Sequence, residues 1–217
     1  MKTTNTGNTK LGKKIVVVSR PIGKSCPNTC PYLHNGCYAE ATEHRFPNAR
    51  TAVEQNMTIT LSGVQDALTF AERNNKDIRI HERGDFCQNN RLDQPYVATW
   101  RKALKARTSR RFVWSYTHYY TRMLANLNTI ANVSIYASIH SPADIAKARK
   151  AGFSLFAFCS KIRGKKGGNR QVPTYLNIPL LGRSLVCPEQ RLGRKRVTCD
   201  KCRWCVEGKG NVVFLDH

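Results

Sequence analysis

Short apolar runs alternate with stretches in which apolar positions recur every three or four residues along most of the chain. The runs are rich in β-branched and aromatic residues, which is typical of buried strands. Five runs are well defined and a sixth is weaker; they cover residues 13–19, 77–81, 110–118, 132–140, 153–160 and 172–180. Strands that alternate with helices predict βαβ units with right-handed crossovers, and therefore a parallel sheet.

The stretches between the runs carry signals for helix starts and ends. Ser62, followed by Gln65, predicts a capping box ahead of an apolar stripe. Residues 93–107 place their apolar side chains on one helical face. Ser141 followed by a proline predicts a capped helix that ends at Gly152.

The number of strands bounds the fold class, because eight parallel strands close a (β/α) barrel and five or six do not. We therefore expect an α/β fold, a partial (β/α)5–6 barrel of parallel strands over residues 13–182. Residues 1–12 are expected to be a disordered basic tail. Residues 183–217 are rich in cysteine and poor in strand signals, so we expect a C-terminal cysteine-rich metal module packed on the barrel.

The net charge of the chain indicates a class of binding partner. The 217 residues contain 36 Lys and Arg against 14 Asp and Glu, which gives a net charge of +22. Self-repulsion of this size favours a polyanionic partner, so we predict nucleic acid, with DNA and RNA left open. The alternative is a solvated surface that only keeps the protein soluble. No apolar stretch reaches the roughly 20 residues of a membrane span, which predicts a cytoplasmic protein without a membrane partner; the oligomeric state is left open.

The basic residues cluster at 100–111, 161–170 and 191–196. Such clusters suit phosphate backbones, which supply affinity without sequence information. We predict nucleic-acid contacts from the last two clusters, at Lys161, Arg163, Lys165, Lys166, Arg170, Arg191, Arg194, Lys195 and Arg196. Tyr119 and Tyr120, just beyond a strand end, are candidates for stacking on unpaired bases.

Parallel α/β proteins bind ligands at the carboxyl ends of their strands. Three predicted middle strands end in a histidine, at His81, His118 and His140, and Asp85 closely follows the first. A single histidine in such a place is more often structural. Three histidines on one rim predict a group that handles substrate or protons.

Nine cysteines are a high and odd number. In a reducing compartment, clustered cysteines are more often metal ligands or catalytic groups than disulfides. Cys26, Cys30 and Cys37 follow the first strand with C-x3-C-x6-C spacing. Zinc at these thiols needs a fourth ligand, either His34 or a rim histidine. A [4Fe–4S] cluster held by three thiols keeps one iron open.

This loop after the first strand of a partial parallel barrel resembles that of the radical S-adenosylmethionine enzymes, whose usual spacing is C-x3-C-x2-C. The resemblance implies that Cys26, Cys30 and Cys37 hold a [4Fe–4S] cluster whose open iron binds S-adenosylmethionine. It also implies that Gly84 and Asp85, in the "ERGDF" stretch, contact this cofactor.

A second resemblance covers most of the chain. An uncharacterised family of phage and phage-derived bacterial proteins is similar to it in "VVVSRPIGKSCPNTCPYLHNGCYAE", "ERGDF", "YTH" and "VCPEQ…TCDKCRWC…VVFLDH". The resemblance implies the host cytoplasm for a phage-encoded protein, and it brings no established activity.

The second cysteine group lies near the C-terminus, at Cys187, Cys199, Cys202 and Cys205. Four thiolates close a tetrahedral zinc site or bind a second iron–sulfur cluster, and they leave no open position, so we expect a structural role. The remaining two cysteines, Cys87 and Cys159, are expected to be small buried apolar residues.

Three functional hypotheses follow. The first is a metal-cluster enzyme that resembles radical S-adenosylmethionine proteins and modifies DNA, RNA or a nucleotide. The second is a non-catalytic zinc protein that binds nucleic acid, such as a phage regulator. The third is a metal-dependent hydrolase or nuclease that uses the rim histidines and Asp85 directly.

Overall fold

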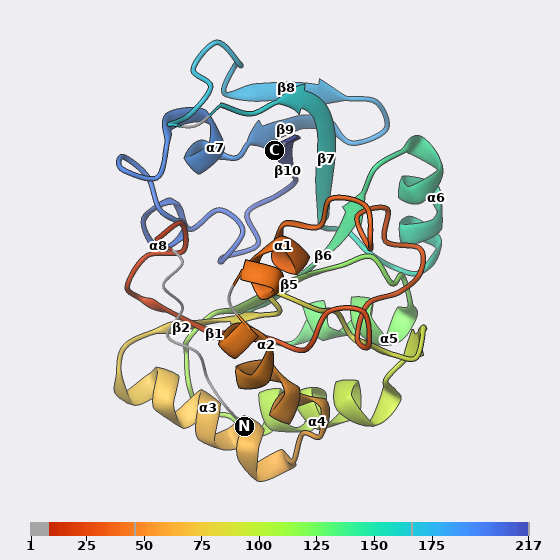
Figure 1. Cartoon of the computed structure of the whole chain (residues 1–217), viewed down its shortest axis with the longest axis vertical. Coiled ribbons are helices and arrows are strands. Elements are labelled where there is room, and N and C mark those ends of the chain that lie inside the picture. Colours follow the sequence, from red (N-terminus) through yellow and green to blue (C-terminus); the bar gives the residue numbers. More distant parts are fainter. Residues whose placement is uncertain (1–8, 46, 166, 217) are drawn as a thin grey trace.

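A computed structural model of the chain describes residues 9–45, 47–165 and 167–216. Its centre is one eight-stranded sheet with the strand order β1-β2-β5-β6-β7-β10-β9-β8 (Figure 1). The strands are β1 (Ile15–Val18), β2 (Asp77–Ile80), β5 (Val113–Thr117), β6 (Val133–Ile139), β7 (Phe156–Arg163), β8 (Tyr175–Ile178), β9 (Gly182–Val186) and β10 (Val212–Asp216). Within the described sheet, every neighbouring pair is parallel except β8 with β9.

The five strands that the apolar runs predicted most clearly are confirmed as β1, β2, β5, β6 and β7, and they lie side by side in chain order. The sixth run forms β8, which is not a further parallel strand. Only residues 179–181 separate β8 from β9, and a connection this short permits an antiparallel pair alone. Leu180 takes a φ of 67° in this turn.

The segment after residue 183 contains two strands of the main sheet, which corrects the expectation that it is poor in strands. The last strand of the chain, β10, lies between β7 and β9 and pairs with both. Its four apolar residues form a run that is short and isolated in the sequence. Neighbours distant in sequence on both sides complete its hydrogen bonding.

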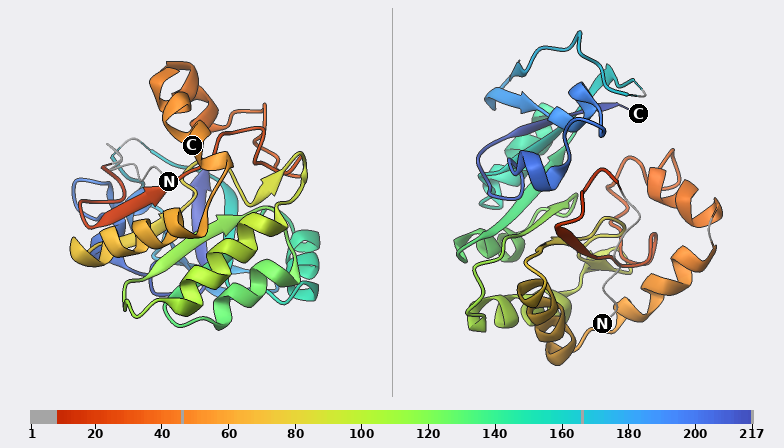
Figure 2. Two further views of the ribbon diagram at one scale, coloured as in Figure 1. Left: turned by 90° about the horizontal axis from the view of Figure 1, so that it is seen from below. Right: turned by 90° about the vertical axis from the view of Figure 1, so that its left-hand side faces the viewer.

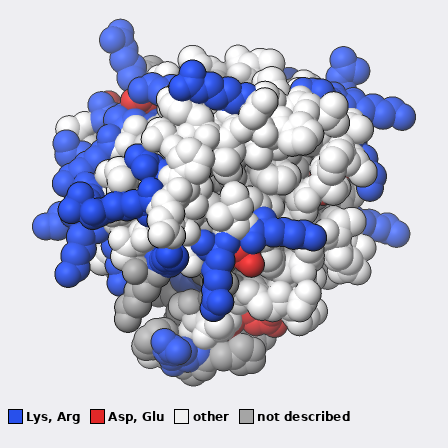
Figure 3. Space-filling view, turned by 90° about the horizontal axis from the view of Figure 1, so that it is seen from above, with Lys and Arg blue, Asp and Glu red and all other residues white. Residues whose placement is uncertain are grey.

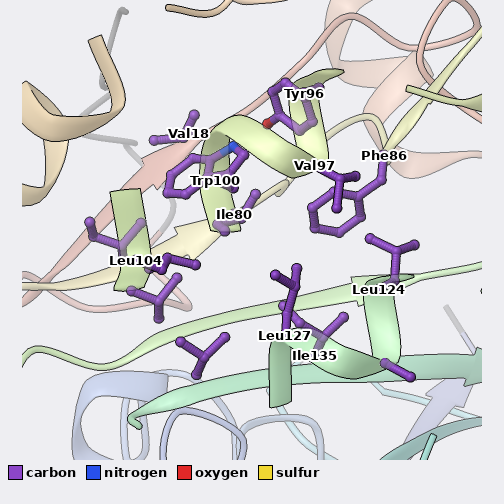
Figure 4. Packing of buried hydrophobic residues seen from close by; sticks show 14 of the residues in the cluster. Val18, Ile80, Phe86, Tyr96, Val97, Trp100, Leu104, Leu124, Leu127 and Ile135 are labelled. Carbon is purple, nitrogen blue, oxygen red and sulfur yellow. The ribbon is translucent and has the colours of Figure 1, made fainter. Parts of the chain in front are cut away.

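Four helices cover one face of the sheet, namely α3 (Leu61–Arg73), α4 (Gln94–Ala106), α5 (Arg122–Ala125) and α6 (Pro142–Lys150). Figure 4 shows how Trp100 and Leu104 of α4 pack against Ile80 of β2 in this core. Burying a large apolar side chain in this way contributes about 1.5–3 kcal/mol. The apolar stripes predicted for α3 and α4 therefore form part of the main core.

Local capping explains where these helices begin. The Asp93 carboxylate accepts a hydrogen bond from the Tyr96 amide at 3.1 Å, and Ser141 caps α6 as predicted. The predicted cap of α3 is wrong by two residues. Thr60 is the cap and accepts from the Gly63 amide at 3.1 Å, because its extended backbone leaves the side chain free to fold back. Ser62 already lies inside the helix.

The opposite face of the sheet is covered by the cysteine-rich segment between β9 and β10. Val206 of this segment packs with Trp114 of β5, and Cys187 packs with Tyr136 of β6. Two short helices lie in the segment, α7 (Pro188–Leu192) and α8 (Cys199–Cys202). Leu11 is also buried here, so the end of the expected basic tail is folded; residues 1–8 of that tail lie outside the described residues.

The remaining elements lie at the carboxyl ends of the first strands. They are α1 (Tyr38–Arg45), α2 (Pro47–Glu54), the 3-10 helix η1 (Gln55–Met57) and the hairpin strands β3 (Cys87–Gln88) and β4 (Arg91–Leu92). A second 3-10 helix, η2 (Asn126–Thr129), connects α5 to β6. Helices α1 and α2 stand away from the sheet (Figure 2). In the described ranges, no helix is long and apolar enough to cross a membrane.

Candidate active site at the rim of the sheet

The loop that carries the first three cysteines begins at a buried anchor. Arg20, which follows β1, is fully buried, and its guanidinium donates to the Asp93 carboxylate at 2.6 Å and to the Cys87 carbonyl at 3.1 Å. The same guanidinium lies 4.1 Å from the ring centroid of Tyr96. Loss of one partner from a buried charge pair strongly destabilises a folded protein. The contact between Arg20 and Asp93 therefore holds the loop firmly at the start of α4.

Hydrogen bonds then hold the first half of the loop against the segment that follows β2. The Cys87 amide donates to the Ser25 carbonyl at 3.2 Å, and the Asn28 amide donates to the Asn90 side chain at 2.7 Å. Asn90 and its neighbour Asn89 both take positive φ angles in the β3–β4 turn, a conformation that asparagine tolerates well. Cys26 therefore lies between two residues, Ser25 and Asn28, whose backbones are hydrogen-bonded to this segment.

Gly84 is required by this packing. Its φ is +77°, and a Cβ there would lie 2.3 Å from the Ser25 hydroxyl and 2.7 Å from the Arg20 carbonyl. No other residue fits so close an approach. The contact accounts for a glycine at this position, and its expected role at a cofactor stays a prediction.

Asp85 is buried and joins the ends of β2 and β5. Its Oδ1 accepts from the Phe86 amide and the Thr117 hydroxyl, both at 2.7 Å, and its Oδ2 accepts from the His118 amide at 2.9 Å. Burial raises the pKa of the Asp85 carboxyl to about 6, and these hydrogen bonds limit the rise. Asp85 thus positions the end of β5; contact with a cofactor stays a prediction.

His118 and His140 meet at the ends of β5 and β6. Their Nε2 atoms are 3.0 Å apart, and the rings are nearly parallel, with centroids 5.2 Å apart. One ring donates and the other accepts, so the pair shares one proton. Burial and the neighbouring His140 together lower the pKa of His118 to about 3, although the carboxylate of Asp144 opposes part of this shift. Burial also lowers the pKa of His140, which the carboxylate of Asp144 opposes.

Tyr32 connects the three-cysteine loop to this pair. Its ring meets His140 edge-on with centroids 5.2 Å apart, and its hydroxyl shares a hydrogen bond with the Cys159 thiol of β7. Burial raises the pKa values of Tyr32 and Cys159 to about 12. The sequence did not predict either residue at this site. Tyr32 belongs to no motif, and Cys159 was expected to be a small buried apolar residue. The position of Cys159 near the end of a predicted strand was the one signal that could have placed it at the rim. We call Tyr32, Asp85, His118, His140 and Cys159 the rim group.

His81 does not join the rim group. Its φ is +61°, and its ring is buried against Phe86 and Tyr96, where Nε2 lies 2.8 Å from the Tyr96 hydroxyl. Burial, together with Arg20 and Arg79, lowers its pKa well below the ordinary value. The structure therefore does not bring His81 together with the other two predicted histidines, because the turn after β2 directs it into the helix-covered core.

The three loop cysteines are close enough to influence one another. Burial raises the pKa of Cys26 to about 12; Asp85, Cys30 and Cys37 contribute to this rise, and a backbone hydrogen bond with Gly23 opposes it. His34, the expected fourth zinc ligand of the loop, is mostly exposed and lies 2.9 Å from Glu40. No group of three or more His, Cys, Asp or Glu side chains in the described part of the chain is arranged to hold a metal ion. The ligand roles stay predictions.

The C-terminal cysteines gather on the other face of the sheet. Burial raises the pKa of Cys199 to about 12, and the Cys187 and Cys202 thiols are among its electrostatic neighbours. Cys205 is influenced by all three others. Burial lowers the pKa of Lys10, but Cys187 and Glu189 raise it by more, so this ammonium ion is held beside the thiols. Cys87, by contrast, is fully buried as predicted.

The comparisons with known proteins bear on identity. Residues 1–208 match the family described as Gene product 88. This chain belongs to the Gene product 88 family. The match spans both cysteine groups and the rim group, and it confirms the predicted relation to phage proteins. Among all solved structures, none matches the chain.

Two relatives of this Gene product 88 chain come from mycobacteriophages. The Gene 88 protein of Mycobacterium phage L5 is 25% identical over 230 residues, which cover 95% of this chain and 90% of the relative. The Gene 88 protein of Mycobacterium phage D29 is 24% identical over 228 residues, with the same coverage. Their names state no activity, so function rests on the geometry of the site.

Proposed function

We propose that the protein is a metal-cluster enzyme whose reactive centre lies at the rim of the sheet, in a partial (β/α) barrel similar to that of radical S-adenosylmethionine proteins. The observation that carries the proposal is the position of Tyr32. This residue belongs to the three-cysteine loop and touches both His140 and Cys159. The predicted metal ligands and the histidine pair therefore share one site.

The strand order supports the same proposal. Strands β1, β2, β5, β6 and β7 follow one another in chain order, and helices α3 to α6 pack on one face. Single winding of this kind is the arrangement of a (β/α) barrel, whose reactions occur at the carboxyl ends of the strands. The rim group lies at that end.

The donor set favours a [4Fe–4S] cluster over zinc at the first site. Zinc needs four ligands, and in the described part of the chain no histidine lies together with the three thiols in a group that could hold a metal ion. His34, the histidine of the loop, is mostly exposed beside Glu40. The three thiols alone suit a cluster with one open iron, which would supply an electron to a bound cofactor. Cys26, Cys30 and Cys37 would hold it, after rotation of their side chains.

The rim histidines supply proton transfer in this proposal. Because the pKa of His118 is lowered to about 3, the pair is neutral near pH 7 and holds one mobile proton between the two Nε2 atoms. In a neutral pair one ring can give up a proton while the other accepts one, so the two histidines can relay a proton at the rim without either becoming an imidazolium ion. Asp85 acts as a positioning residue, because it binds the backbone amide of His118.

The C-terminal cysteines provide a structural metal site in the same proposal. Four thiolates around one divalent ion carry a net charge of −2. Lys10 and Arg79 are cations with an electrostatic influence on Cys199, and they offset that charge. Zinc is the expected ion, since four cysteines leave no open position for a substrate.

Iron analysis of protein purified without oxygen tests the proposal. We expect a brown protein with about four irons per chain at the first site, and loss of that iron in Cys30→Ala. Addition of S-adenosylmethionine should change the electron paramagnetic resonance signal of the reduced protein. A colourless protein with zinc at this site would overturn the proposal and favour a non-catalytic nucleic-acid-binding protein; strand cleavage that depends on an added divalent ion would instead indicate a nuclease.

A further inference from the structure

Two basic stretches that are far apart in the sequence form one surface. We define the two-loop surface as residues 161–165, 167–170 and 191–196. The Asn169 amide donates to the Gln190 carbonyl at 3.0 Å. A Cβ on Gly168 would lie 2.6 Å from the Gly193 nitrogen, and a Cβ on Gly193 would lie 2.3 Å from the Gly167 carbonyl oxygen. The two backbones are therefore in direct contact.

This contact joins the cations of both stretches. The described cations of the two-loop surface are Lys161, Arg163, Lys165, Arg170, Arg191, Arg194, Lys195 and Arg196; Lys166 was also predicted, and it lies outside the described residues. All but Arg191 are exposed. Figure 3 shows Lys and Arg side chains crowded on the left of the molecule, the side on which α7 lies in Figure 1. A dense group of exposed cations is the electrostatic footprint of a phosphate backbone.

The two-loop surface is continuous with the rim group through β7. Cys159 of this strand contacts Tyr32, and Lys161 and Arg163 follow it along the same strand. The loop then begins at Gly164, whose amide donates to the Asp216 carbonyl at 2.6 Å, at the end of β10. A nucleic-acid backbone bound to the two loops would therefore extend along β7 toward the rim group.

An exposed aromatic side chain follows the first of these loops in the chain. Tyr175 begins β8 five residues after Arg170, and 36% of it is exposed. The Arg183 guanidinium covers one face of the ring, 4.1 Å from its centroid. Aromatic rings backed by arginine stack on unpaired bases at about 1–3 kcal/mol per base. Paired bases do not offer their faces for such stacking.

We propose that the two-loop surface binds a single-stranded nucleic acid and presents it to the rim group. Single-stranded nucleic acid is then the substrate class of the proposed enzyme. Only the reaction at the rim group rests on the proposed function. Binding itself depends on surface charge and on Tyr175. It can therefore be measured without iron and without S-adenosylmethionine.

Fluorescence anisotropy with labelled 20-nucleotide single-stranded DNA, single-stranded RNA and duplex DNA tests the inference across a range of KCl concentrations. We expect binding to fall steeply with salt. The variant Arg194→Gln/Lys195→Gln/Arg196→Gln should reduce the log–log slope by about 2, since each phosphate contact contributes about 0.7 for single strands. Tyr175→Ala should weaken single-strand binding without changing the slope.

A matched variant removes three charges from the helix-covered side of the molecule. Arg101, Lys102 and Lys105 are exposed on α4, and their change to Gln should leave the salt slope nearly unaltered. Equal slopes in the two triple variants would overturn the inference, as would tighter binding to phosphatidylserine vesicles than to any oligonucleotide. Cys30→Ala should bind nucleic acid like the parent, so loss of the iron centre and loss of binding remain distinguishable.

Discussion

At the scale of single residues, three histidines at three strand ends have different environments. His118 and His140 face each other at the rim, with their Nε2 atoms 3.0 Å apart. His81 has a positive φ and lies in the core with one ring nitrogen, Nδ1, unpartnered. An imidazole in this apolar place is held neutral, because burial disfavours the charged form.

The first prediction concerns His81 and acid. Its folded pKa lies well below that of the unfolded chain, so the unfolded state binds more protons below about pH 6.5 and stability falls as pH decreases. His81 alone should cost about 1.4 kcal/mol per pH unit in that range. We expect His81→Asn, which suits the positive φ, to reduce the pH dependence of the free energy of unfolding in urea.

His34→Asn is the matched control for this change. His34 has nearly the same φ, 59° against 61°, but its side chain is mostly exposed. Equal pH dependence of the unfolding free energy in the two variants would contradict the burial argument. His118 and His140 remain in both variants, so part of the acid sensitivity should persist.

At the scale of elements, the path of the chain around α8 brings Cys199, Cys202 and Cys205 toward one another. One helical turn separates Cys199 from Cys202. Arg203 then takes a left-handed conformation with a φ of 59° and donates to Asp77 at 2.8 Å, so the chain reverses and brings Cys205 back to the sheet. The Cys199 amide also donates to the Lys10 carbonyl at 3.0 Å. The N-terminal segment thus closes over the same group.

The second prediction follows from the proposed zinc site. Metal binding that is coupled to folding contributes several kcal/mol, so Cys202→Ser should remove about one zinc per chain and lower the free energy of unfolding markedly. Cys87→Ala is the control, because it changes only packing in the core. Inductively coupled plasma analysis and urea unfolding would decide; unchanged zinc and stability in Cys202→Ser would refute the site.

At the scale of the whole molecule, the position of β10 makes the sheet one cooperative unit. The last strand of the chain pairs with β7 on one side and β9 on the other. Its Val213 and Leu215 pack in one apolar cluster, and Val212 packs in another on the opposite face. Both faces of the sheet therefore depend on the C-terminal segment.

The third prediction is that residues 1–182 do not fold by themselves. Removal of residues 183–217 would leave β7 as an exposed edge and uncover Trp114 and Tyr136, which pack against the C-terminal segment. We expect this fragment to lack the near-ultraviolet circular dichroism of the full chain, which itself should unfold in a single transition. A fragment that unfolds cooperatively would show that the C-terminal segment is a separable module.

The five central strands, the apolar face of α4, the cap of α6 and the spacing of both cysteine groups could all be read from the sequence. These features are local, because apolar periodicity and caps act within a few residues. Three features emerge only in the folded chain: His81 leaves the rim, Tyr32 and Cys159 join it, and Gly168 and Gly193 allow the backbones of two basic loops to come into contact. Each of these depends on which way a turn directs a side chain, or on contacts between residues far apart in the chain, and no local pattern contains that information.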